Sequence, residues 1–354
     1  MRLCYITYKV DAHDALVGHV VGWIKELARH LDQIEVVCLA AAPTEFPANV
    51  RVHSLGKESG VSRIGRWQKF FQVVWNLRAE IDSVFCQFSP EYVIGIAPLA
   101  FLGRWPITFW YTHRHTGFRL RLATVFARRV VTATPESFGL ITTKLQVIGH
   151  GIDTERFRPK NYSLPKTPTL LAVGRRSPIK NYELLIDSVE ILVKQHGWKD
   201  LRVRIVGGDE GNAPPAYTDQ LQDRINAAGL SQIVELVGPV PFDQIPSEYN
   251  AANMHINLCP TGGMDKAVLE GMSCGIPTLV RNKTFQPLLA PLEAGLLPGT
   301  DRPEVIAEHI STILSHSEKE QLQFGKQLRQ VMLENYGQAA FAKRLADVLI
   351  QASK

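Results

Sequence analysis

The 354-residue sequence lacks the features of several protein classes. No apolar run reaches the roughly 18 residues that a membrane-spanning helix needs, so no transmembrane segment is expected. The chain starts directly with a strand-like segment, Arg2–Tyr8, so no signal peptide is expected. The five cysteines are scattered and form no Cys-x-x-Cys pair, which argues against a zinc site and against a disulfide framework. Small hydrophobic thiols in a reducing cytoplasm are the expected alternative.

Familiar nucleotide-binding motifs are missing as well. No Gly-x-Gly-x-x-Gly follows the first strand or the strand that contains Leu170, which excludes an NAD-dependent dehydrogenase. No recognised nucleic-acid-binding motif accompanies the basic residues, so nucleic acid is not an expected partner.

The composition is that of a globular protein with more than one domain. Apolar residues make up 45% of the chain and charged residues 21%. A chain of 354 residues exceeds the size at which one core keeps growing, so two domains are expected. Apolar strand-like runs alternate with helical runs such as Val17–Leu31, Asn181–Gln195 and Ala267–Ser273. The predicted strands are Arg2–Tyr8, Ile34–Ala40, Arg51–Leu55, Val84–Phe88, Pro106–Tyr111, Arg129–Ala133, Leu145–Ile148, Thr169–Val173, Arg202–Val206, Ile233–Val237, His255–Leu258 and Pro277–Val280. This alternation predicts an α/β protein with parallel sheets covered by helices on both faces.

A proline-rich segment divides the chain. Arg158–Pro168 holds three prolines and shows no periodicity, which is typical of a linker. We therefore expect an N-terminal domain over residues 1–158 and a C-terminal domain over residues 159–335, each Rossmann-like and doubly wound, facing each other across a cleft. Residues 336–354 form an amphipathic helix.

The positive charge lies in the first half of the chain. Residues 1–158 hold 19 Lys and Arg against 13 Asp and Glu, whereas residues 159–354 hold 20 against 21. The cations concentrate in Arg114–Arg129 and, with aromatic residues between them, in Arg63–Arg78. Basic and aromatic residues on helices favour contact with an anionic membrane surface. The alternative is that the apolar residues of the first segment, Phe118, Leu122, Val125 and Phe126, face the core while the arginines are solvated.

Two segments of the second half carry the chemistry. Val173–Lys180 places cations where a strand ends, and Thr261–Gly275 supplies a Gly-Gly turn, a helix N-terminus and the carboxylate of Glu270. Phosphate groups bind backbone N–H groups, the positive end of a helix dipole and fixed cations, and ribose hydroxyls bind a carboxylate. The pair of segments therefore predicts a site for a nucleoside diphosphate that bears a sugar.

These segments resemble the GT-B glycosyltransferases and, within them, glycosyltransferase family 4, the retaining group that uses nucleotide sugars. The resemblance rests on Val173–Asn181, Val203–Asp209, Val237–Gly238 and Ala267–Thr278, with His150–Pro159 similar to the family's entry to the linker. It covers the C-terminal half throughout and the N-terminal half in layout and short pieces. It implies that the helix at 336–354 packs back on the first domain.

The resemblance assigns roles to particular residues. Arg175 and Lys180, next to Gly174, would bind the donor diphosphate and neutralise charge on the leaving group. Glu270 would accept hydrogen bonds from the ribose, and the backbone near Gly238 would read the base. Because no Asp-x-Asp follows a suitable strand, we expect the cations to replace a divalent metal, and neither a metal nor a cofactor is expected beyond the donor itself.

One position departs from the family pattern. The family places a first glutamate eight residues before the second, and here that position is Gly262. The change bears on which donor sugar is held and on whether catalysis survives. Asp265 either restores a carboxylate contact or caps the following helix, and the sequence leaves both interpretations open. Gly263, Met264 and Asp265 can present backbone N–H groups to the ligand.

In the first half, His113 follows an apolar strand and matches the family's histidine on the acceptor side. His115 is the rival candidate. Gly18, in the loop after the first strand, and Glu91, after another strand, are expected to line the acceptor side; for Glu91, loop packing is an equal explanation.

The sequence thus predicts a hexosyltransferase that moves a sugar from a nucleoside diphosphate sugar to a hydroxyl of a glycan or lipid-linked acceptor, with retention and without metal. The alternatives are a non-catalytic sugar-nucleotide-binding protein, motivated by Gly262, and a GT-B sugar-nucleotide epimerase. The expected location is the cytoplasm, peripheral at the inner membrane face.

Overall fold

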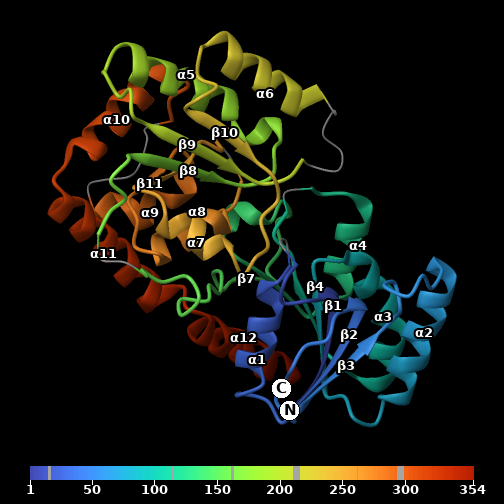
Figure 1. The fold of residues 1–354 in the computed structure, drawn as a ribbon. Coiled ribbons are helices and arrows are strands. Elements are labelled where there is room, and N and C mark those ends of the chain that lie inside the picture. Colours follow the sequence, from blue (N-terminus) through green and yellow to red (C-terminus); the bar gives the residue numbers. More distant parts are fainter. Residues whose placement is uncertain (15–16, 114, 161–162, 210–215, 261, 293–298) are drawn as a thin grey trace. The chain divides into compact units, whose positions relative to one another are not determined.

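The computed structural model describes residues 1–14, 17–113, 115–160, 163–209, 216–260, 262–292 and 299–354. The chain folds into two units (Figure 1), one formed by residues 1–151 and 337–354 and the other by residues 152–336. The N-terminal stretch of the first unit thus runs to Gly151, whereas the sequence suggested a boundary at residue 158. Part of the predicted linker, residues 161–162, lies outside the described residues.

The first unit is built on a parallel seven-stranded sheet in the order β3-β2-β1-β4-β5-β6-β7. Its strands are apolar runs that the sheet buries on both faces, and in β4 all five residues are buried. The strand order reverses between β1 and β4, as in a doubly wound fold. The strands are β1 Arg2–Val10, β2 Gln33–Ala41, β3 Val50–Ser54, β4 Ser83–Gln87, β5 Ile107–Trp110, β6 Arg129–Thr132 and β7 Leu145–Val147.

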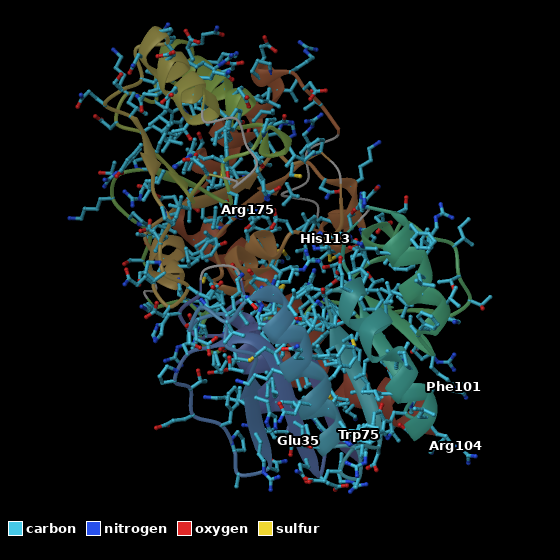
Figure 2. The ribbon with its side chains drawn as sticks, turned by 90° about the vertical axis from the view of Figure 1, so that its right-hand side faces the viewer. Glu35, Trp75, Phe101, Arg104, His113 and Arg175 are labelled. Carbon is cyan, nitrogen blue, oxygen red and sulfur yellow. The ribbon has the colours of Figure 1, made fainter. Side chains whose placement is uncertain are left out.

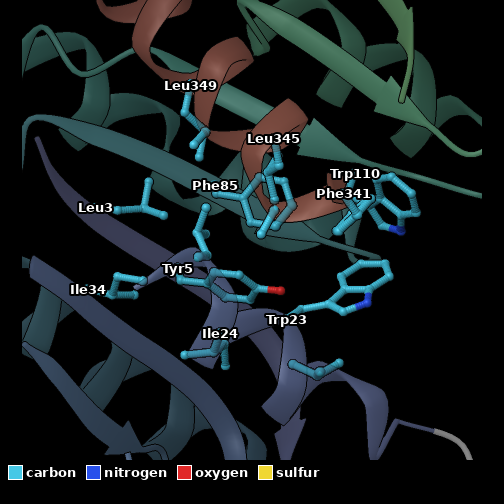
Figure 3. Close-up of a cluster of buried hydrophobic side chains, with 14 of the residues drawn as sticks. Leu3, Tyr5, Trp23, Ile24, Ile34, Phe85, Trp110, Phe341, Leu345 and Leu349 are labelled. Atoms are coloured by element: carbon cyan, nitrogen blue, oxygen red, sulfur yellow. The ribbon is translucent and has the colours of Figure 1, made fainter. Parts of the chain in front are cut away.

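Two helices from opposite ends of the chain cover one face of this sheet. Helix α1 (His19–Leu27) and helix α12 (Gln338–Ser353) lie side by side on it. Figure 3 shows their shared core, in which the rings of Trp23 and Phe341 lie 4.1 Å apart between centroids. The Trp23 indole N–H donates to the carbonyl oxygen of Gly151 (2.8 Å). The C-terminal helix is therefore an integral part of the first unit.

The other face carries α2 (Arg63–Asn76), α3 (Pro90–Gly103) and α4 (Phe118–Phe126). Ser62 begins α2, since its side chain accepts a hydrogen bond from the Gly65 N–H (3.2 Å). Helix α3 ends at Arg104, whose φ of 56° places it in the left-handed region. A second core lies between these helices and the sheet.

The second unit has a parallel five-stranded sheet in the order β10-β9-β8-β11-β12. Helices α5, α6 and α10 pack on one face, and α7, α8, α9 and α11 on the other. The strands are β8 Thr169–Val173, β9 Arg202–Val206, β10 Val234–Val237, β11 Met254–Asn257 and β12 Thr278–Val280. The helices are α5 Tyr182–Lys194, α6 Ala216–Ala227, α7 Ile245–Asn250, α8 Lys266–Ser273, α9 Gln286–Leu289, α10 Pro303–Ser315 and α11 Glu318–Asn335. Short 3-10 helices are η1 Pro135–Ser137 in the first unit and η2 Pro178–Lys180, η3 Lys283–Phe285 and η4 Ala290–Leu292 in the second.

The predicted α/β class with two parallel, doubly wound sheets is confirmed. The predicted helix Val17–Leu31 is shorter and spans His19–Leu27. Among the helices of the described residues, none is long and apolar enough to cross a membrane.

The interpretation of α4 as a helix with a buried aromatic stripe is wrong. Phe118 is 77% exposed and Val125 67% exposed, whereas Leu120, Ala123 and Thr124 face the sheet. The helical spacing of apolar residues is the same for either face, so the sequence alone did not decide between them.

Candidate functional site

Charged residues meet where the neighbouring strands β8 and β11 end. Lys180, at the end of η2, follows β8, and its side chain is 19% exposed. Its ammonium group donates a hydrogen bond to the carboxylate of Asp265, which follows β11. Burial alone would lower the pKa of Lys180, but the Asp265 carboxylate raises it above its ordinary value, against the effect of the nearby Arg175 cation. The structure therefore brings these three predicted residues into one electrostatic cluster.

Asp265 caps helix α8. Its carboxylate accepts hydrogen bonds from the backbone N–H of Ala267 (3.2 Å) and from the side-chain amide of Asn257 (3.0 Å). Although burial would raise the pKa of this carboxyl group, Lys180, Asn257 and the Ala267 N–H lower it to about 2. Asp265 is thus ionised at neutral pH. Of the two interpretations left open by the sequence, the structure shows the helix cap.

Glu270 lies one turn further along α8 and is half-buried. Burial raises the pKa of its carboxyl group, and the neighbouring Lys266 cation opposes this shift. Burial likewise lowers the pKa of Lys266, which the Glu270 carboxylate opposes. Below them the Tyr249 hydroxyl donates to the carbonyl oxygen of Ala267 (2.7 Å). The first turns of α8 therefore carry a lysine and a glutamate four residues apart, whose charges act on each other.

The Gly-Gly turn before α8 is held by residues that follow β12. Asn282 donates through its side-chain amide to the carbonyl oxygens of Gly262 (3.3 Å) and Gly263 (3.2 Å), and the Thr284 hydroxyl donates to Gly262 (3.0 Å). Gly262 has a φ of +108°, a conformation that L side chains rarely adopt. A glutamate at this position would strain the backbone, so the turn is built for glycine. The preceding residue of the motif, Thr261, lies outside the described residues.

The two consecutive arginines after β8 have different surroundings. Arg175 is exposed, whereas Arg176 is 7% exposed and donates through Nε to the Asp209 carboxylate (2.9 Å). Arg176 also donates to the carbonyl oxygen of Val237 (3.1 Å), so it ties together the ends of β8, β9 and β10. Arg176 is therefore structural, whereas Arg175 is exposed to solvent.

Gly174 lies against the Lys180 side chain. A Cβ atom at Gly174 would come within 3.1 Å of the Lys180 Cε atom and of the Tyr182 hydroxyl. Tyr182 donates from that hydroxyl to the Gly174 carbonyl oxygen (2.9 Å). Of the remaining predicted residues, Met264 is half-buried against the core below α8, and Gly238 is exposed at the end of β10 with open space around its Cα atom.

In the first unit, His113 and His115 are exposed in the loop after β5. The His113 ring lies 5.5 Å from the Tyr111 ring, centroid to centroid, in an edge-to-face arrangement. The Tyr111 hydroxyl donates to the carbonyl oxygen of His115 (3.3 Å). Tyr111 thus supports this loop, and both imidazoles lie at the C-terminal edge of the sheet.

The other two predicted residues of this unit have structural roles. Gly18 is buried, has right-handed helical dihedral angles and begins α1, so its φ does not require glycine. Glu91 accepts a hydrogen bond from the Ser89 hydroxyl (3.0 Å) and pairs with Arg119 (2.8 Å), which joins α3 to α4. Burial favours the neutral form of Glu91, but the backbone, Ser89 and Arg119 lower its pKa.

Sequence reasoning missed the residues that support the site, namely Asn257, Tyr182, Asn282, Thr284 and Lys266. Asn257 and Asn282 stand at or just after the ends of β11 and β12, and that position is a usable signal. Lys266 stands at the first position of a helix, where a cation is unfavourable without a neighbouring anion. Among the described residues, no group of three or more His, Cys, Asp or Glu side chains could hold a metal ion.

Comparison with known sequences points to one family. Residues 167–316, which contain the whole α8 site, match the family model described as "Glycosyl transferases group 1". The chain is 26% identical over 167 residues to mannosylfructose-phosphate synthase of Agrobacterium fabrum. It is also 26% identical over 153 residues to D-inositol 3-phosphate glycosyltransferase of Kineococcus radiotolerans. These matches cover 43% and 40% of this chain, and only 37% and 35% of the relatives' own lengths.

Solved structures match over nearly the whole chain. HepE of Anabaena in complex with UDP has a TM-score of 0.75 at 16% identity, covering 99% of this chain and 100% of that one. Sucrose-phosphate synthase of Thermosynechococcus elongatus has a TM-score of 0.74 at 17% identity, covering 99% and 98%. At such identities the likeness shows the fold. The structural likeness therefore shows the GT-B fold, and residues 167–316 match the model of the group 1 glycosyltransferases.

Proposed function

We propose that the protein transfers a hexose from a nucleoside diphosphate sugar to an acceptor hydroxyl, with retention of anomeric configuration and without a metal ion. The observation that carries this proposal is the cluster of Arg175, Lys180 and the N-terminus of α8 at the ends of β8 and β11. Parallel sheets bind ligands outside the carboxyl ends of their strands, where the strand order reverses, and β8 and β11 flank that point.

Each residue of the cluster has a chemical task in this proposal. As the bond between the sugar and the phosphate breaks, negative charge accumulates on the leaving diphosphate, and Arg175 and Lys180 stabilise that charge. Glu270 accepts hydrogen bonds from the ribose, and the backbone N–H groups of the Gly262–Asp265 turn face the sugar. A UDP-glucose complex of the structurally similar HepE supports the donor class.

The acceptor hydroxyl is proposed to bind at the first unit. His113, exposed in the loop after β5, is the residue proposed to approach that hydroxyl, with His115 two residues away. A glycan or a lipid-linked sugar is the proposed acceptor class. The reaction also needs water to be excluded from the donor as the bond breaks.

Isothermal titration with UDP, GDP and ADP tests the proposal. We expect one of these nucleotides to bind with a dissociation constant in the micromolar to low millimolar range, in buffer that contains EDTA. Loss of all binding in EDTA, with recovery by Mg²⁺, would contradict the metal-free site. Product analysis with the matching sugar nucleotide then distinguishes transfer or hydrolysis from epimerisation. The absence of any product would indicate binding without turnover, the alternative that Gly262 motivates.

We further propose that the first unit binds an anionic membrane surface. Helices α2, α3 and α4 end in the same way, with an exposed apolar ring and an arginine two or three residues later. The pairs are Trp75 with Arg78, Phe101 with Arg104 and Phe126 with Arg128, and the three rings are 52%, 85% and 43% exposed. Figure 2 shows Trp75, Phe101 and Arg104 at the same end of the first unit.

At the ends of α3 and α4, carbonyl groups are bonded by partners other than the arginine side chains, whereas at the end of α2 the Arg78 guanidinium donates to the Trp75 carbonyl oxygen (2.7 Å). The backbone N–H of Trp105 bonds the Ala100 carbonyl at the end of α3, and Lys144 bonds the carbonyls of Thr124 and Val125 at the end of α4. A groove of about 520 Å³ between the ends of α3, α4 and α12 is lined by Phe101, Arg104, Trp105, Phe126 and Arg128. Rings that enter the interface and cations that pair with phosphates fit an anionic bilayer.

Replacing Arg104 and Arg128 together with glutamine should weaken binding to phosphatidylglycerol vesicles about 30-fold, because each basic residue near an anionic surface contributes about 1 kcal/mol. Co-sedimentation with such vesicles measures the effect. The control is the double substitution Arg29→Gln and Lys343→Gln, which removes the same charge from two other exposed positions, one just after α1 and one on α12. It should leave binding nearly unchanged. Equal losses in the two double variants would show that net charge, and not this surface, determines binding.

A further inference from the structure

The anion-binding groups of the proposed donor site already hold an anion that belongs to the chain. The Asp265 carboxylate accepts hydrogen bonds from an N–H in the first turn of α8 and from the Lys180 ammonium. A helix N-terminus and a lysine are the same donors that a phosphate group would use. Asn257 contributes a third hydrogen bond, so Asp265 is fixed in this place.

We infer that Asp265 acts as an internal counter-ion, through which the site discriminates between ligands by their charge. With Asp265 in place, the site binds the free nucleoside diphosphate less well relative to the nucleoside diphosphate sugar. The inference rests on the proposed function and deepens it. Asp265 is a specificity-determining residue here, because it competes with the ligand's phosphates for Lys180 and for the helix N-terminus.

The discrimination follows from counting ligand charges. In a nucleoside diphosphate sugar each phosphate is esterified and carries one negative charge. Release of the sugar exposes a terminal phosphate, which gains most of a second charge at pH 7 because its pKa is about 6. A fixed carboxylate nearby therefore repels the product more than the substrate, and a charge pair a few ångströms apart changes affinity by a factor of about 10 or more. Such repulsion favours product release.

The neighbouring charges support this assignment. Lys180 and Arg175 supply two cations and Asp265 one carboxylate, while burial shifts the pKa values of the neighbouring Lys266 and Glu270 toward their neutral forms, so the site has little positive charge in excess. The pKa of Asp265, lowered to about 2, keeps its charge fixed throughout the physiological range. Asp265 therefore stays ionised whichever ligand is bound, and its repulsion depends only on the charge of the ligand.

The substitution Asp265→Asn tests the inference. Asparagine also caps helices well, so the variant removes the charge and keeps an acceptor for the Ala267 N–H. Asp265→Ser gives a second neutral cap of different size. The matched control is Asp187→Asn, which removes the same charge from an exposed pair with Arg224 on the surface of the same unit. Thermal melting verifies that each variant is folded.

Titration calorimetry compares UDP, GDP and ADP with their glucose esters, for wild type and variants. We expect Asp265→Asn and Asp265→Ser to strengthen binding of the preferred nucleoside diphosphate about 10-fold. Binding of its glucose ester should strengthen by about 3-fold at most. Asp187→Asn should change neither affinity. If Asp187→Asn strengthened nucleoside diphosphate binding as much as the Asp265 variants do, the net charge of the protein would explain the effect, and the inference would be wrong.

Other outcomes separate the inference from the proposed function. Suppose that wild type binds the nucleotide and that the Asp265 variants bind the nucleotide and its glucose ester no more tightly than wild type does. The inference is then wrong and the proposed function stands, with Asp265 as a residue that positions Lys180. If neither wild type nor the Asp265 variants bind any of the nucleotides, the proposed function and the inference are both refuted. Binding by the Asp265 variants alone would support the inference directly.

Discussion

Replacing Arg175 with alanine should slow donor turnover about 100-fold, equivalent to about 2.7 kcal/mol of lost transition-state stabilisation. The guanidinium is exposed at the end of β8, and its charge acts on Lys180 in the same cluster. Because charge builds on the leaving diphosphate only as the glycosidic bond breaks, the loss should appear mainly in kcat. Lys180 remains to hold the ground-state diphosphate.

The measurement is the rate of sugar-nucleotide hydrolysis or transfer under saturating donor. Arg202→Ala is the matched control, since Arg202 is an exposed arginine of the same unit at the start of β9, where it pairs with Glu235. That variant should retain full turnover. Turnover within a factor of two of wild type for Arg175→Ala would remove Arg175 from the proposed mechanism, whereas a change confined to KM would limit its role to ground-state binding.

The fold was accessible from the sequence because its signals are local. Buried parallel strands are short, nearly continuous apolar runs, and each predicted strand, from Arg2–Tyr8 to Pro277–Val280, coincides with an observed strand to within a few residues. The parallel arrangement follows from helices that intervene between most strands. What the local signal does not contain is which face of a helix is buried, and α4 exposes Phe118 and Val125 for that reason.

The site was accessible only in part. Arg175, Lys180, Asp265 and Glu270 stand out because charged residues follow apolar strands or begin a helix. The pairing of Lys180 with Asp265 joins residues 85 positions apart, and no local pattern encodes such a contact. The same holds for Asn282, which supports the Gly262 turn from the next strand. Residue types at strand ends thus predict where chemistry occurs, and tertiary contacts decide which charges remain available to a ligand.

The close approach of two loops makes Gly207 the most sensitive position of the donor site outside its charged residues. A Cβ atom at Gly207 would lie 2.1 Å from the carbonyl oxygen of Gly174 and 2.7 Å from its carbonyl carbon. Gly174 is held by its own N–H bond to Val206 (2.9 Å) and by the Tyr182 hydroxyl, so it has little freedom to yield. The ends of β8 and β9 are therefore packed backbone against backbone.

Gly207→Ala should consequently destabilise the protein by about 2–3 kcal/mol, the upper range for overpacking, and lower the apparent melting temperature by about 5–10 °C. Because the displaced residue, Gly174, precedes Arg175, nucleotide binding at a temperature where the variant is still folded should weaken at least about 10-fold. Thermal melting and calorimetry measure the two effects. Gly208→Ala is the matched control, since the atoms nearest its Cβ atom would be those of Pro239, at ordinary contact distances of 3.6 Å or more. If both variants melt and bind alike, the steric contact between Gly207 and Gly174 does not shape the site.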